Sequence, residues 1–237
     1  MDPNPLERPN QSPEDHWIPL SDLMTGLMMF FMLISLTYMI KVETVDARIR
    51  KIAVRYDELH VDLYRDLKKE FGSDLPTWGA EIHKDLSVRF REPDILFDTG
   101  SDTLKPRFKA ILDNFFPRYV RILTSAKYRN SVREIRIEGH TSSFWKGATS
   151  QDDAYFRNMA LSQARTRTTL EYVLTLPDVH KNEGWLKNRL TANGLSSSHL
   201  VLTQTGQEDR SRSQRVEFRV RTDAEARIAT IIEAAKE

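Results

Sequence analysis

One acidic side chain inside an apolar stretch is the residue of this sequence best suited to chemistry. Asp22 is the only charged residue between Trp17 and Ile40, a run rich in Leu, Met, Phe and Ile. A carboxylate at the centre of a membrane helix costs about 2.5 to 3.5 kcal/mol, so such residues are rare and usually functional. Asp22 follows Trp17 by only about 7.5 Å of helix axis, where it can reach the lipid headgroups at little cost. The residues alone leave both interpretations of Asp22 open.

The rest of the chain matches no catalytic or metal-binding pattern. His140 and Ser142 lie close together in the sequence, but no third triad member or nucleophile elbow accompanies them, so we expect no enzyme activity. The six histidines lack the spacing of metal ligands, and there is no Gly-rich phosphate loop. Zero cysteines exclude disulfides and thiolate sites, and a net charge of +1 gives no basis for nucleic-acid binding. We therefore expect no metal, no cofactor and no nucleic-acid partner.

The apolar stretch 17–40 is long enough to cross a hydrocarbon core of roughly 30 Å as one helix. Trp17 and Tyr38 lie where interfacial aromatic residues are expected, and Lys41 follows the far end. The basic start and the small-residue cleavage site of a signal peptide are both missing. The pattern predicts an uncleaved, single-pass anchor in membrane lipid, preceded by a disordered tail over the Pro-rich residues 1–16.

A helical linker is predicted over residues 41–71. Apolar residues recur there with spacings of 3 and 4, at Val42, Val45, Ile49, Ile52, Tyr56, Leu59 and Leu63. This is the seam of a parallel coiled coil and predicts a homodimer. A single amphipathic helix lying on its own domain is the alternative, because Ala53 and Val61 widen the apolar stripe. Extended backwards, the seam includes Met24 and Met28 but not Asp22, which would then face a second membrane subunit.

Residues 72–222 alternate predicted strands and helices, and about 160 residues beyond the anchor are enough for one ordinary domain. The predicted strands are Glu81–Phe90, Val132–His140, Leu200–Thr205 and Arg215–Arg221, and the helices are Pro106–Leu123 and Ala154–Leu176. This βαβαββ order predicts an α+β domain with helices on a mixed sheet. A closing helix is expected over 223–237, with Asp223 as its N-cap.

Four segments carry a family resemblance. FDTGSDTLKPRFKAIL, IEGHTSS, NMALSQAR and RSQRVEFRV occur in this order and resemble the OmpA-like peptidoglycan-binding domain over about Leu86 to Arg221. The Trp17 region, with Ser-Asp-Leu-Met-Thr and a following Phe-Phe pair, resembles the ion-motor B subunits exemplified by flagellar MotB. The Gly-His-Thr-Ser-Ser turn and the direct heptad continuation are more similar to the B subunits of Zorya anti-phage defence systems than to flagellar ones.

The resemblance implies roles for residues in the anchor and the wall-binding domain. Asp22 matches the carrier of the transported ion, a proton or alternatively sodium, because a carboxylate out of water can alternate between neutral and charged forms. Thr25 would bond that carboxylate or its own helix backbone. Asn158, Leu161 and Arg165 match the helix motif of the peptidoglycan-binding domain, and Arg165 would hold a diaminopimelate carboxylate through a bidentate fork.

Two positions of the wall-binding domain are less settled. Arg215 matches an arginine of the closing strand, with a structural ion pair as the alternative. Ser142 stands where most of the family has the aspartate that binds the amine of diaminopimelate. Asp152 or Asp153 would then supply the missing charge, or wall binding would be altered.

The resemblance also implies partners and a location. It places the chain in the bacterial inner membrane, with a cytoplasmic N-terminus, a periplasmic wall-bound domain and a multi-span MotA-like subunit around two anchors. The positive-inside rule favours the opposite orientation, since Arg8 alone precedes the anchor, whereas Lys41, Arg48, Arg50, Lys51 and Arg55 follow it. We follow the resemblance because peptidoglycan lies only outside. The alternatives are a flagellar-type stator, or a passive membrane-to-wall anchor without ion flow.

Overall fold

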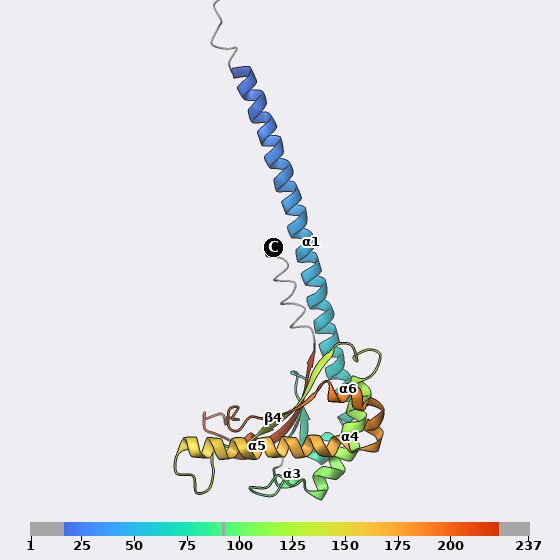
Figure 1. Cartoon of the computed structure of the whole chain (residues 1–237), viewed down its shortest axis with the longest axis vertical. Helices are drawn as coiled ribbons and strands as arrows, with labels where there is room; N and C mark the ends of the chain where they lie inside the picture. The colour runs from blue at the N-terminus through green and yellow to red at the C-terminus, as the bar shows by residue number, and fades with distance from the viewer. Residues whose placement is uncertain (1–16, 92, 223–237) are drawn as a thin grey trace, which may run out of the picture. The chain divides into compact units, whose positions relative to one another are not determined.

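A computed structural model describes the backbone of residues 17–91 and 93–222 (Figure 1). The chain divides into two compact units that meet between Ile52 and Ala53. The tail predicted over 1–16 and the closing helix predicted over 223–237 lie outside the described residues.

The first unit consists of the N-terminal part of helix α1 (Trp17–Phe71). Among the described residues, Leu20–Val45 is the one helical segment long and apolar enough to cross a membrane, with a mean hydropathy of 2.0. Its large apolar side chains, such as Met28 and Phe31, are exposed in the isolated chain. Such a continuous apolar surface requires lipid or protein around it. The predicted N-terminal apolar helix is confirmed.

The C-terminal end of α1 belongs to the second unit and its core. Leu63, Leu67 and Phe71 are buried there, and the rings of Phe71 and Phe115 lie 5.1 Å apart. The heptad pattern predicts Leu63 on a dimer seam, but the structure buries it in its own domain. This end of the linker therefore matches the alternative, an amphipathic helix lying on its own domain. The coiled coil over the preceding heptads remains a prediction.

The second unit is built on a five-stranded mixed sheet in the order β1-β2-β5-β3-β4. Its strands are β1 (Ala80–Ile82), β2 (Ser87–Phe90), β3 (Val132–His140), β4 (Leu190–Gly194) and β5 (Arg215–Thr222). Only β3 and β4 pair in parallel; the other neighbours are antiparallel. The predicted α+β domain with helices on a mixed sheet is thus confirmed, with two corrections to its strands.

The single strand predicted over Glu81–Phe90 is wrong, because the chain turns back between β1 and β2. Leu86 adopts a positive φ of 60°, and the Asp85 carboxylate accepts bonds from the backbone and hydroxyl of Ser87. The strand predicted over Leu200–Thr205 is also wrong. That segment holds one isolated bridge, between Leu202 and Glu208, around a turn at Gly206. The strand that completes the sheet is β4, which the sequence analysis missed.

The helices of this unit after α1 are α2 (Leu75–Trp78), α3 (Pro93–Leu96), α4 (Pro106–Leu123), α5 (Gln151–Leu174), the 3-10 helix η2 (Pro177–Asn182), α6 (Glu183–Lys187) and α7 (Arg210–Ser213). Helices α4 and α5 cover one face of the sheet, and shorter helices flank them or lie in the connections. Helix α4 has the predicted bounds and continues through Pro117. The Phe115 ring of α4 lies 5.2 Å from Phe90 of β2 and 5.2 Å from Phe218 of β5. These aromatic contacts form the centre of the core.

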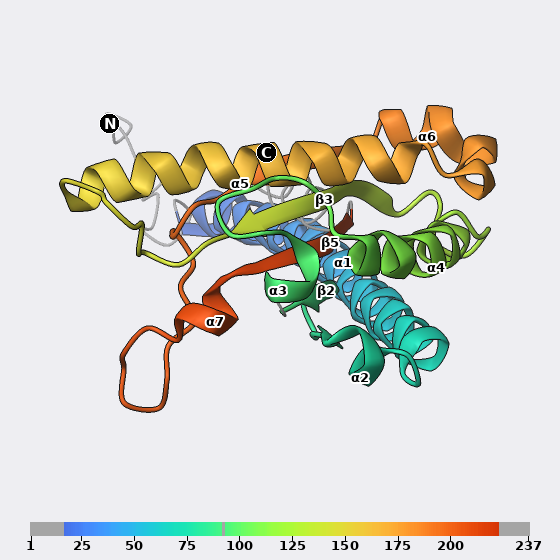
Figure 2. The ribbon, with the colours of Figure 1, turned by 90° about the horizontal axis from the view of Figure 1, so that it is seen from below.

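Helix α5 runs along β3 and β4 (Figure 2). It approaches closely because glycines face it on both strands. A Cβ at Gly194 would lie 2.3 Å from the backbone nitrogen of Gln163, and one at Gly139 would lie 2.9 Å from the Ser162 carbonyl oxygen. The close packing fixes α5 against the ends of β3 and β4, and α5 carries three of the predicted wall-binding residues.

Candidate functional site

In the apolar helix, Thr25 bonds the backbone of its own helix. Its hydroxyl donates to the Ser21 carbonyl oxygen at 2.8 Å, and Thr37 bonds Leu33 in the same way at 2.9 Å. Threonine in an apolar helix commonly satisfies its hydroxyl like this. Asp22 is exposed on the isolated helix. Within this chain, Thr25 therefore bonds its own helix backbone and not the Asp22 carboxylate. The Asp22 side chain is accessible to the lipid or protein that surrounds the helix.

Two of the predicted wall-binding residues, Ser142 and Asn158, lie where β3 ends and α5 begins. Ser142 is buried in the turn after β3. Asn158 of α5 is also buried, and its side-chain amide donates to the Phe144 carbonyl oxygen at 3.3 Å, which ties this turn to the helix. Leu161 is half-buried one turn further along α5. The Thr141 hydroxyl is buried here and has no hydrogen-bond partner among the described residues.

Arg165 lies further along α5, against the loop that precedes α4. Its Nε donates to the Ser101 carbonyl oxygen at 2.8 Å and its Nη2 to that of Asp98 at 3.1 Å, while its guanidinium lies 4.8 Å from the centre of the Phe97 ring. Burial lowers the pKa of Arg165 to about 10, so the group stays charged at neutral pH. No carboxylate forms an ion pair with Arg165 in the described part of the chain. Arg165 is thus a half-buried cation whose hydrogen bonds go to neutral groups, and Asp102 acts on it through its charge.

Arg215 has a different environment. It is 7% exposed, and its Nε donates to Glu217 at 2.6 Å while its Nη1 donates to the carbonyl oxygens of His199 and Ser213. Glu217 is fully buried and also pairs with Arg89 and Arg219. Arg215 therefore forms a structural ion pair with Glu217, which was the alternative to a role in wall binding.

The two acids predicted to replace the missing charge at Ser142 have different environments. The Asp153 carboxylate accepts bonds from the Thr149 backbone at 3.0 Å and from Arg157 at 2.7 Å, and these partners lower its pKa. The Asp153 side chain therefore stabilises the first turn of α5. Asp152 lies beside it, exposed in the first turn of the helix.

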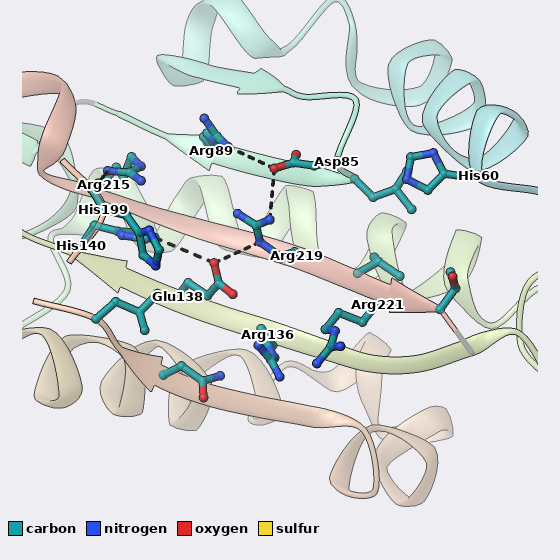
Figure 3. Close-up of a pocket in the computed structure, with 15 residues that line it drawn as sticks. His60, Asp85, Arg89, Arg136, Glu138, His140, His199, Arg215, Arg219 and Arg221 are labelled. Carbon is teal, nitrogen blue, oxygen red and sulfur yellow. Dashed lines mark hydrogen bonds and ion pairs between the residues drawn. The ribbon is translucent and has the colours of Figure 1, made fainter. Parts of the chain in front are cut away.

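A charged network that the sequence analysis did not identify covers the other face of the sheet (Figure 3). A cavity of about 560 Å³ opens there, and its wall includes five arginines: Arg89, Arg136, Arg215, Arg219 and Arg221. Arg219 bonds Glu138 at 3.0 Å and Asp85 at 3.1 Å. Glu134 pairs with Arg136. The charged residues that alternate along strands β3 and β5 are the sequence pattern that could have predicted this charged face.

His140 lies within this network and is a buried titratable group. It is 4% exposed, and neither ring nitrogen has a hydrogen-bond partner among the described residues. Its Nε2 lies 3.6 Å from Glu217 and 3.9 Å from Glu138. Burial, followed by the charge of Arg215, lowers the pKa of His140 to about 3. His140 is therefore neutral at physiological pH.

Glu138, His140 and Glu217 have the chemistry of a metal-ligand set, since one ligand atom of each lies within 4.8 Å of the others. The surrounding charges oppose a cation, however. Arg215 bonds the Glu217 oxygen that faces His140, and Arg219 bonds the corresponding oxygen of Glu138. A divalent ion would have to displace these arginines or be buried beside them, which is costly.

The fold and the site define a class of protein in which one apolar N-terminal helix precedes an α+β domain with a buried polar turn and a half-buried arginine. Comparison with known proteins gives the family. The chain is 49% identical over 220 residues to the Zorya protein ZorB of Escherichia coli, a match that covers 92% of this chain and 93% of that protein. The chain therefore belongs to the ZorB family, and the predicted relationship to B subunits of Zorya systems is confirmed. A search of family models gave no match.

Solved structures show weaker likenesses. A putative MotB-like protein from Desulfovibrio vulgaris is 23% identical, covers 70% of this chain and 95% of its own, and has a TM-score of 0.48. The cell wall anchor of the T6SS from Pseudomonas aeruginosa is 23% identical over 66% of this chain and 96% of its own, with a TM-score of 0.45. The periplasmic domain of Helicobacter pylori MotB is 16% identical over 62% and 84%, with a TM-score of 0.41. The family assignment rests on the identity with ZorB.

Proposed function

We propose that this chain is the peptidoglycan-anchored B subunit of a MotB-like, proton-driven membrane motor that acts in Zorya anti-phage defence. Membership of the ZorB family supports the Zorya assignment. The apolar segment Leu20–Val45 supports a single span of the inner membrane. In this proposal the N-terminus lies in the cytoplasm and the C-terminal domain in the periplasm, since peptidoglycan lies only outside. The partners are a second copy of the chain and a multi-span MotA-like subunit. No step of this function requires a cofactor or makes the chain an enzyme.

The observation that carries wall binding is the environment of Arg165. The hydrogen bonds of this half-buried guanidinium go to two carbonyl oxygens, and an aromatic ring packs on it; within the described residues Asp102 acts on it through its charge, but no carboxylate is bonded to it directly. Leaving such a charge unpaired is costly, and a carboxylate is the group that a guanidinium binds best, through two parallel bonds. The free carboxylate of a diaminopimelate stem peptide supplies it.

Sedimentation with purified peptidoglycan sacculi tests this proposal, using the full chain in detergent. Because a hydrogen bond to a charged group contributes about 1.5 to 3 kcal/mol, Arg165→Ala should weaken binding about tenfold or more. Arg165→Lys keeps the charge without the fork and should also weaken it. The matched control is Arg167→Ala, which removes an exposed arginine of the same helix that pairs with Glu171. Equal binding by Arg165→Ala and Arg167→Ala would contradict wall anchoring through Arg165.

Asp22 carries the motor part of the proposal. It is the only charged residue before Lys41 in the apolar segment, and a group that takes up and releases a proton there couples ion flow to movement. One charge crossing 100 mV releases about 2.3 kcal/mol, which is enough to drive a conformational step.

Ion flux in vesicles that contain the chain and its membrane partner tests this role. Asp22→Asn, which preserves shape but cannot ionise, should abolish flux, whereas Asp22→Glu should retain part of it. A pH gradient and a sodium gradient applied separately distinguish the two candidate ions. Equal flux with wild type and Asp22→Asn would leave a passive membrane-to-wall anchor as the function.

A further inference from the structure

The cavity on the open face of the sheet has no part in the proposed motor or in wall binding. Its volume of about 560 Å³ is far larger than a water molecule needs, and its wall is mostly polar. Arg136, Glu138 and His140 occupy alternate positions of β3, so their side chains share this face. Arg136 lies at one end and His140 at the other (Figure 3), roughly 13 Å apart along the strand.

The first end of the cavity concentrates positive charge around Arg136. The Glu134 Oε2 atom lies 2.9 Å from Arg136 Nε and 3.6 Å from Arg221 Nη1, so two guanidinium groups share one carboxylate oxygen. Although Glu134 is close, the buried Arg136 Nε has no well-directed hydrogen bond among the described residues. Arg219 lies directly opposite Arg136 in the β3–β5 register, and like charges in such a pair repel each other. This end of the cavity therefore favours an anion.

The second end presents a ring with unused hydrogen-bonding capacity. His140 is 4% exposed, and neither of its ring nitrogens has a partner in the part of the chain that the structure describes. A neutral imidazole carries one N–H donor and one acceptor nitrogen, and leaving them unpaired in a buried place is costly. A hydroxyl group can bond either nitrogen, because it both donates and accepts.

The acids between the two ends are already bonded to arginines. Glu138 accepts from Arg219 at 3.0 Å, and Glu217 accepts from Arg215 at 2.6 Å. A second negative charge placed beside these carboxylates would be repelled, whereas a neutral polar group would not. The cavity therefore suits a ligand with one anionic end and a neutral, hydroxyl-bearing remainder.

We infer that this cavity binds a phosphate ester, with the phosphate at Arg136 and a hydroxyl group of the remainder at His140. Arginine suits phosphate because its planar fork can form two parallel bonds to the oxygens. The inference goes beyond the proposed motor and wall-binding functions, since it gives the open face of the sheet a ligand of its own. A lipid headgroup and a free phosphate ester share this chemistry.

Calorimetric titration of the full chain in a non-ionic detergent with three soluble probes tests this inference. The probes are inorganic phosphate, glycerol 1-phosphate and glycerophosphoglycerol, which is the diester headgroup of phosphatidylglycerol. The preferred ester should bind about threefold to tenfold more tightly than inorganic phosphate, because an ester gains the hydrogen bond to His140. Tighter binding of the diester would identify a lipid headgroup as the ligand, and tighter binding of the monoester would identify a free phosphate ester.

Substitutions at the two ends separate the two contacts. Arg136→Gln removes the charge and should weaken binding of all three probes about tenfold or more, and Arg136→Lys should weaken it less. His140→Phe keeps a ring without nitrogens; it should weaken the preferred ester about threefold to tenfold and leave inorganic phosphate unchanged. The matched control is Arg133→Gln, which changes an exposed arginine of the same strand and should bind all probes like wild type.

Three results would overturn the inference. They are no binding of either ester at millimolar concentration, equal affinity for inorganic phosphate and both esters, and ester binding that Arg136→Gln leaves unchanged. Unchanged thermal unfolding, followed by the fluorescence of buried Trp78 and Trp185, excludes loss of the fold as the cause of weaker binding. Arg136→Gln should still sediment with sacculi like wild type, so wall binding and the phosphate-ester site stand or fall separately.

Discussion

His140 links the stability of the wall-binding domain to pH at the scale of a single residue. The ring is surrounded by Glu138 and Glu217, with the Arg215 and Arg219 guanidinium groups beside those carboxylates and His199 opposite. The acids favour a proton on the ring, whereas burial and the arginines oppose it, and the second effect dominates because the pKa of His140 falls to about 3. In the unfolded chain, the same ring would have a pKa near 6.5.

The direction of the pH effect follows from these two values. Between pH 6.5 and 3 the unfolded chain binds a proton at His140 that the folded domain does not, so the free energy of unfolding falls as the pH falls. The slope approaches about 1.4 kcal/mol per pH unit for this one group. Burial acts to raise the pKa of Glu217, but neighbouring charges, including those of Arg215 and Arg89, outweigh it and lower that pKa, so Glu217 adds to the loss at the acid end of this range.

We predict that His140→Gln has a flatter stability profile than wild type between pH 7 and 5. Urea unfolding of the full chain in detergent, followed by tryptophan fluorescence, measures it. The readout is the slope with pH, because the substitution also changes the free energy of unfolding at neutral pH. His180→Gln, a change in the surface helix η2, is the control and should keep the wild-type slope. A slope unchanged by His140→Gln would place the acid sensitivity elsewhere.

At the scale of elements, the last turns of α1 are structurally part of the domain. Arg118 of α4 bonds Glu70 at 2.8 Å and Asp74 at 2.8 Å, and its guanidinium lies 4.9 Å from the centre of the Phe71 ring. Leu67 is fully buried in the same region. This end of the linker therefore cannot separate from the domain without exposing core side chains.

Leu67→Ala should lower the free energy of unfolding of the domain by about 2 to 5 kcal/mol, because it leaves a cavity in a packed core. Val61→Ala, on the exposed side of the same helix, should change it by less than about 0.5 kcal/mol. Urea unfolding at neutral pH compares the two variants. A small effect of Leu67→Ala would mean that the end of α1 is a detachable linker after all.

The elements that the sequence predicted well are those whose own residues carry the signal. Strand β3 alternates clearly, and α4 combines an amphipathic pattern with proline at its first turn. Strand β4 has no such signal, because Leu190–Gly194 contains asparagine and glycine; it is a strand because β3 pairs with it and α5 packs on it. The reversal between β1 and β2 depends on a positive φ at Leu86, which alternation does not reveal.

The residues of the candidate site also differ in whether a local sequence pattern reveals them. Asn158 and Arg165 could be located from a local motif on one helix. The charged network around His140 could not, since it requires the order of the strands, because Glu138 and Glu217 lie on neighbouring strands that are distant in sequence.

At the scale of the whole molecule, the proposed dimer must bring two apolar helices together. On the predicted seam, Met24 and Met28 face the dimer axis. Asp22 precedes Met28 by six residues, which at about 100° per residue places it roughly 120° around the helix, away from that axis. Two copies paired in this way present their Asp22 side chains to the proposed multi-span partner rather than to each other.

Disulfide trapping tests this arrangement directly, because the native chain has no cysteine and an introduced one has no competitor. With Met28→Cys, oxidation in membranes should give a covalent dimer in high yield, since seam side chains of a parallel pair face each other across the axis and a disulfide forms when their Cβ atoms come within about 4 Å. Met29→Cys, one position off the seam and equally apolar, is the matched control and should give much less. A higher yield from Met29→Cys would mean that the dimer interface lies on a different face of the helix, so that Asp22 points in a different direction relative to the dimer axis. The ion carrier of the proposed motor would then have to be reached by its partner from a different side.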